Sequence, residues 1–105
     1  MKRKTYELQA EICKALAHPL RIEIIELLGK KEMCFSDILK KTGGLKSTLS
    51  QQLSLMVEKG ILQSRKDSRC VYFRLTSAKV EKVCGLMREV LIKNIDHKKK
   101  MLMQA

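Results

Sequence analysis

The chain has 105 residues, the length of one small domain. Lys and Arg number 22 against 11 Asp and Glu, so the formal net charge is +11 and a polyanionic partner is the default expectation. No apolar run approaches the ~20 residues of a membrane span, and the basic start leads into an amphipathic segment instead of a signal sequence. We therefore expect a cytoplasmic protein without membrane partners. Four cysteines in that reducing compartment favour free thiols, metal ligands or redox sensors over structural disulfides.

The first third of the chain predicts two helices. Over residues 5–17, apolar side chains recur at the spacing of one buried helical face. They are Leu8, Ile12, Ala15 and Leu16. His18 and Pro19 interrupt this helix, and Pro19 suits the first turn of a second helix over residues 19–29, because its missing N–H needs no partner there.

The middle of the chain predicts a helix, a turn, a second helix and a hairpin. A helix over residues 35–42 ends at two glycines, and a second helix covers residues 46–59. Residues 61–75 read as two strands around a tight turn. This order is that of a winged helix-turn-helix, which places its second helix in the DNA major groove and its hairpin, the wing, along the backbone.

A last helix is predicted over residues 77–95, followed by a frayed tail. Its apolar stripe is too wide for one contact, so we expect it to pack on its own domain and on a second copy. The predicted architecture is a mainly α fold with a β-hairpin wing: one domain over residues 1–105, with five helices.

Several segments occur in the order and spacing of a known family. They are Lys14 to Arg21, Ile24 to Leu28, Ser47 to Leu53 and Val71 to Leu75. On these segments the chain resembles the ArsR/SmtB repressors. The resemblance implies a homodimer built on the first and last helices, an inverted-repeat operator in double-stranded DNA, and release of that DNA when an inducer binds.

The second helix of the motif carries candidate DNA contacts on the face opposite its apolar stripe of Leu49, Leu53, Met56 and Val57. Short polar groups and glutamine reach base edges without steric conflict. The residues expected near bases are Lys46, Ser47, Thr48, Ser50 and Gln51, with Gln52 nearer the phosphates. An ordinary solvated helix face is the alternative. The Leu45-Lys46 pair departs from the family, which often has a polar cap and a neutral amide there.

The hairpin carries a second set of candidate contacts. Its basic residues are expected to hold phosphates and fix the register of the protein on DNA. They are Arg65, Lys66 and Arg69, with Arg74 further along the strand. The alternative is that these charges protect a hairpin edge from aggregation.

Three cysteines are candidate sensors of a metal or redox signal. Cys34 resembles the arsenic-sensing signature of the family, but Ser36 stands where a second cysteine is expected. A thiophilic metal(loid) such as arsenite would need further thiolates, from Cys13, Cys70 or Cys84. Cys13 and Cys84 lie on the helices expected to pair, where oxidation or metal binding would change the dimer; the alternative is that they are small core residues.

The leading hypothesis is a sequence-specific repressor released from its operator by a metal(loid) or a reactive-sulfur or redox signal at cysteines. One alternative keeps the fold with silent, structural cysteines. Others are a non-specific architectural DNA-binding protein, or a thiol-transfer or metal-storage protein. No arrangement of residues predicts an enzyme, and the ligand set of a zinc site around Asp96 and His97 is incomplete.

Overall fold

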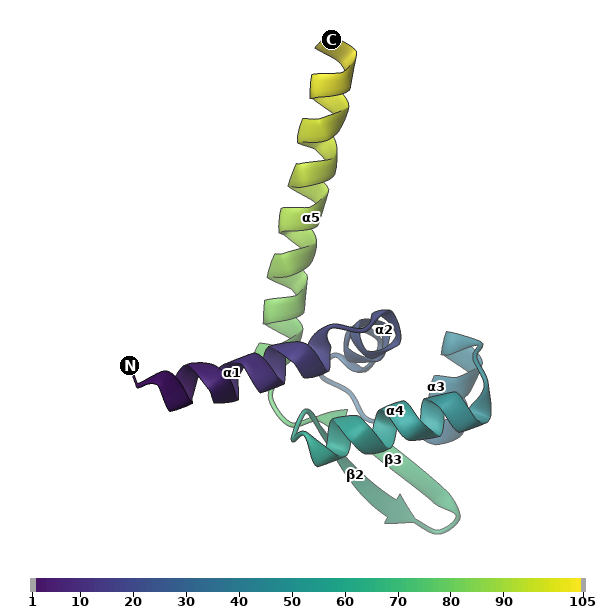
Figure 1. Ribbon diagram of the computed structural model, residues 1–105. Coiled ribbons are helices and arrows are strands. Elements are labelled where there is room, and N and C mark those ends of the chain that lie inside the picture. Colours follow the sequence, from purple (N-terminus) through teal and green to yellow (C-terminus); the bar gives the residue numbers. More distant parts are fainter. Residues whose placement is uncertain (1, 105) are drawn as a thin grey trace.

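The computed structural model describes residues 2–104 and contains five helices and a three-stranded antiparallel sheet in the order β1-β3-β2 (Figure 1). Met1 and Ala105, the ends of the predicted domain, lie outside the described residues. In chain order the elements are α1 (Arg3–Leu16), α2 (Pro19–Leu28), β1 (Met33–Cys34), α3 (Phe35–Thr42), α4 (Lys46–Glu58), β2 (Leu62–Asp67), β3 (Cys70–Leu75) and α5 (Ala78–Gln104). This is the winged helix-turn-helix that the sequence predicts.

The corner between α1 and α2 is built from local hydrogen bonds. Pro19 occupies the first turn of α2, and the imidazole Nδ1 of His18 accepts a hydrogen bond from the Leu20 backbone N–H at 3.2 Å. One of the free N–H groups at the helix start is thereby satisfied. The prediction that His18 and Pro19 start a new helix is confirmed.

The core lies between α2, α3, α4 and one face of the sheet. Its fully buried side chains include Ile24, Ile25, Leu28, Ile38, Leu49, Leu53, Met56 and Leu62. Phe73 and Leu75 of β3 close the core from the sheet side. Because strand residues alternate between faces, their neighbours Tyr72 and Arg74 point to the outer face of the sheet.

Two predicted features differ in the structure. The sheet has a third strand beside the predicted hairpin: β1, whose Met33 and Cys34 pair with Phe73 and Tyr72 of β3. The sequence does not predict this strand, because two residues are too few to show an alternating pattern. The last helix does not end near Ile95 with a frayed tail but continues to Gln104. No Pro or Gly interrupts residues 96–104, and the Lys, Met and Leu residues there favour helix.

The buried face predicted for the first helix is also largely wrong for a single protomer. Ala15 is buried, but Leu8 and Ile12 are 58% and 52% exposed. Figure 1 shows the reason: α1 and α5 project away from the rest of the molecule in different directions. Among the described residues, no helix combines the length and apolar character needed to cross a lipid bilayer.

Candidate nucleic-acid interface

Helix α4 separates an apolar face from an exposed polar face. Leu49, Leu53 and Met56 are buried in the core. The candidate base-contacting residues are all exposed: Lys46, Ser47, Thr48, Ser50 and Gln51. Because Ser47, Ser50 and Gln51 are spaced by three and four residues, they share one side of the helix. That side can be presented to another molecule without breaking a contact in the core.

Gln52 differs from these residues, because it is half-buried and already hydrogen-bonded. Its side-chain oxygen accepts a hydrogen bond of 2.7 Å from Nε of Arg21, which lies on α2. The same guanidinium donates a 2.9 Å hydrogen bond to the backbone carbonyl of Ala15 on α1. One arginine therefore connects α1 and α2 to the middle of α4.

The wing does not present its three predicted cations on one surface. Arg65 lies opposite Tyr72 in the strand register, whereas Lys66 lies opposite Val71, so their side chains leave opposite faces of the sheet. Arg69 lies in the two-residue turn beside Ser68, whose positive φ of 59° closes the hairpin. All three cations are exposed.

Arg65 is held by acidic and aromatic neighbours on the outer face. Its Nε and Nη2 atoms donate to the Glu32 carboxylate at distances of 2.6–3.0 Å, and its guanidinium stacks 4.6 Å from the centre of the Tyr72 ring. Asp67 adds a looser contact of 3.5 Å. Hydrogen bonding from Arg65 lowers the pKa of Glu32, and Glu32 raises the pKa of Arg65, so the pair is fully charged at neutral pH.

Cys34 occupies the N-cap position of α3, between polar side chains. Its sulfur lies 3.1 Å from an Asp37 carboxylate oxygen, to which the thiol donates, and 3.3 Å from the Ser36 hydroxyl. Over residues 2–104, no set of three or more His, Cys, Asp or Glu side chains is arranged to hold a metal ion.

Cys13 and Cys84 both line an apolar hollow of about 420 Å³ where α1, α2 and α5 meet. Cys13 is exposed on α1, whereas Cys84 is half-buried against the core. Burial raises the pKa of the Cys84 thiol, although nearby Arg88 opposes the shift. Arg88 lies at this hollow and forms a 2.8 Å ion pair with Glu26 of α2. The remaining thiol, Cys70, is exposed at the start of β3.

Comparison with known proteins finds relatives that are transcriptional regulators. Residues 18–64 match the model of "Bacterial regulatory protein, arsR family". An HTH-type transcriptional regulator of Mycobacterium tuberculosis, Rv0081, is 34% identical over 87 residues, covering 82% of this chain and 76% of its own. The biofilm growth-associated repressor of Xylella fastidiosa is 31% identical and covers 74% and 68% of the two chains.

Solved structures with a similar fold come from the same kind of protein. The crystal structure of Rv0081 superposes with a TM-score of 0.80 at 30% identity, covering 92% of this chain and 98% of that chain. The homodimeric winged helix-turn-helix DNA-binding domain of Mb0332 from Mycobacterium bovis gives 0.78 at 26% identity, covering 92% of both.

The chain belongs to the arsR family. It is a DNA-binding transcriptional regulator and not an enzyme. In this arsR-family protein the exposed face of α4 and the wing are the surfaces on which the candidate DNA contacts lie. Two residues beside those contacts, Arg21 and Glu32, carry no local sequence signal, because each acts on a residue more than 30 positions away.

The Glu32–Arg65 pair yields a prediction on DNA binding. We expect Glu32→Gln to strengthen non-specific DNA binding and to steepen its salt dependence by about one unit of slope per protomer, because Arg65 becomes free for a phosphate. The measurement is fluorescence anisotropy on random-sequence duplexes over a salt series. Glu23→Gln on α2 is the matched control, since it changes the net charge equally. An identical change in both variants would mean that Arg65 does not reach DNA.

Proposed function

We propose that this arsR-family regulator is a homodimeric, sequence-specific repressor that acts in the cytoplasm and releases its operator in response to thiol chemistry. The observation that carries the proposal is the exposed polar face of α4, whose opposite face is buried in the core. A formal net charge of +11 supports a nucleic acid as the partner of that face.

Sequence recognition is assigned to α4 and backbone contact to the wing. Gln51 offers both a donor and an acceptor, which suits adenine, and the hydroxyls of Ser47, Thr48 and Ser50 suit several bases or a thymine methyl. Lys46, at the first position of α4, suits a phosphate or guanine. Gln52, Lys66 and Arg69 are assigned to phosphates, together with Arg65 once it leaves Glu32.

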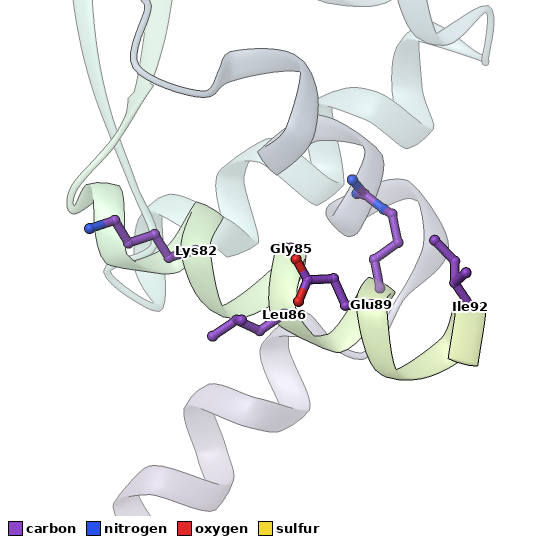
Figure 2. A pocket seen from close by; sticks show the side chains of 6 residues that line it. Lys82, Gly85, Leu86, Glu89 and Ile92 are labelled. Carbon is purple, nitrogen blue, oxygen red and sulfur yellow. The ribbon is translucent and has the colours of Figure 1, made fainter. Parts of the chain in front are cut away.

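A dimer through α1 and α5 is supported by apolar surface that the protomer leaves exposed. Val80 and Cys84 of α5 pack on the core. Another set on α5, with helical spacing, is half or more exposed: Val83, Leu86, Met87 and Val90. Figure 2 shows Leu86 and Ile92 on this helix with Lys82 and Glu89, where they line a surface pocket, and both apolar side chains are more than half exposed.

Helix α1 contributes Tyr6, Leu8 and Ile12, which are also more than half exposed. Apolar stripes on two projecting helices gain most by packing against the same helices of a second copy. The Mb0332 domain, similar over nearly its whole length, is described as homodimeric. Two copies of α4 related by a two-fold axis would read an inverted repeat.

The signal is assigned to the thiols at the apolar hollow. Cys13 and Cys84 line it from α1 and α5, the two helices proposed to form the dimer. An oxidant that takes two electrons and two protons from these thiols leaves a disulfide, within or between protomers, and alters how the helices pack. A coupling of about 1–3 kcal/mol would weaken operator binding by a factor of about 5–150. Cys34 is the second candidate, for a thiophilic metalloid.

Operator binding is tested by anisotropy titration of labelled DNA from upstream of the gene, with a scrambled duplex as control. Reduced protein is expected to prefer the upstream DNA and to lose that preference after diamide, polysulfide or arsenite. Equal affinity for both duplexes would replace the repressor with an architectural DNA-binding protein. Selective binding indifferent to all three reagents would leave the repressor and make the cysteines structural.

Serine substitutions identify which thiols carry the response. We expect Cys13→Ser and Cys84→Ser to retain operator binding but to lose its weakening by diamide, whereas Cys70→Ser, at an exposed position away from the hollow, should respond like the wild type. Because burial raises the pKa of Cys84, its thiolate fraction and its oxidation rate should increase at higher pH than those of an exposed thiol. A normal diamide response in the two hollow variants would contradict this assignment.

A further inference from the structure

We infer that Arg21 is a positioning residue for DNA binding: it orients the Gln52 carboxamide so that its N–H donors, and not its oxygen, face the DNA. The inference rests on the proposed function, because it requires α4 to be the helix that meets DNA. It adds to that function a residue of α2 that acts on DNA binding through Gln52 of α4.

The orientation of Gln52 follows from the chemistry of the two groups. An arginine Nε carries a hydrogen and accepts none, so the amide atom 2.7 Å away is the carbonyl oxygen. With that oxygen engaged, the two N–H bonds of the carboxamide point away from Arg21. A phosphate oxygen only accepts hydrogen bonds, so a fixed amide donor suits it and a fixed amide oxygen would repel it.

Arg21 is itself held by a second contact. Its Nη1 atom donates 2.9 Å to the carbonyl of Ala15, in the last turn of α1. Carbonyls in the last turn of a helix lack partners within the helix, and a cation is favourable there. Ala15 is 6% exposed, so this anchor is part of the core. The guanidinium is thus fixed at one end before it orients Gln52 at the other.

Lysine cannot replace this arrangement. The two hydrogen bonds leave different nitrogens of one planar guanidinium, and the lysine ammonium is a single point with freely rotating donors. Arg21→Lys therefore keeps the charge and loses the fixed geometry. This separates positioning from the simple attraction of a cation for DNA.

A double-mutant cycle on the full-length protein tests the inference. Operator affinity is measured by anisotropy for Arg21→Lys, Arg21→Ala, Gln52→Ala and each double variant, with circular dichroism melts confirming that the proteins are folded. We expect each single substitution to weaken binding about fivefold to tenfold and each double variant to bind no more weakly than Gln52→Ala alone. Gln63→Ala, whose side chain accepts a 3.0 Å hydrogen bond from Arg74 on the wing, is the matched background in which the Arg21 effect should persist in full.

Side-chain amide NMR signals keep the test decisive if Arg21→Ala does not fold. The Gln52 NH₂ signals, assigned by their loss in Gln52→Ala, should shift when operator is added and should move in free Arg21→Lys. Wild-type affinity in a folded Arg21 variant, or penalties that multiply in the double variant, would overturn the inference. Wild-type protein that prefers no DNA sequence would instead remove the proposed function on which the inference rests.

Discussion

Replacing Leu86 by Glu should convert the protein to a monomer and weaken operator binding by about 10²–10⁴-fold. Leu86 is 61% exposed in the middle of the exposed stripe of α5, where a charge would have to be buried against a second copy. Two half-sites bound by one linked dimer gain affinity through effective concentration, and separate protomers lose that gain. Sedimentation equilibrium measures the mass, and anisotropy measures the affinity on the full inverted repeat.

The control for this prediction is the same substitution at an exposed leucine outside α1 and α5. Leu45 is 72% exposed at the N-terminus of α4, so Leu45→Glu should leave the oligomeric state unchanged. Its DNA affinity is not compared, because it adjoins the proposed DNA contacts. A dimeric Leu86→Glu protein with normal operator affinity would show that the copies do not meet on this face of α5.

The second large effect is expected for Gln51→Ala. A bidentate contact from glutamine to adenine is worth about 1–3 kcal/mol of discrimination, and a symmetric dimer makes it twice. If the two half-sites act independently, operator affinity falls by about 30-fold or more, while affinity for random DNA barely changes. Gln51 is exposed and lies outside the core, so the melting temperature should remain that of the wild type.

Two comparisons make the Gln51 experiment specific. Gln104→Ala, at the far end of α5, removes the same side chain and should bind the operator normally. A panel of operators changed at single positions should show that Gln51→Ala relaxes preference at one base pair in each half-site. If random and operator DNA weaken equally, Gln51 contacts the backbone and another residue reads the bases.

The sequence predicts those parts of the candidate interface that depend on residues close together along the chain. Apolar spacing in α4 identifies Leu49, Leu53 and Met56 as buried, and the exposed polar residues follow as the opposite face. The two glycines after α3 and the turn beside Ser68 likewise mark where elements end. In each of these cases, periodicity or turn chemistry within a few residues decides the outcome.

The limits of such patterns appear where an exposed face must be distinguished from a buried one. The stripe containing Leu8 and Ile12 has the spacing of a core face, yet α1 carries it away from its own core. Periodicity shows that a face is apolar but does not identify what covers it. The extension of α5 beyond Ile95 lies outside the predicted helix because residues 96–104 carry no apolar stripe, although the Lys, Met and Leu residues there favour helix.

Patterns along the chain predict the order of the five helices and the hairpin, the basic character of the surface, the polar face of α4 and the arsR-type motif, because each depends on neighbouring residues. Which side chains from distant segments meet depends on how the helices and the sheet pack. This packing places Glu32 on Arg65, Arg21 on Gln52, and Cys13 and Cys84 around one hollow. The residues of each pair are separated by about 30 to 70 positions, and they come together only when the buried faces of several elements pack into a common core.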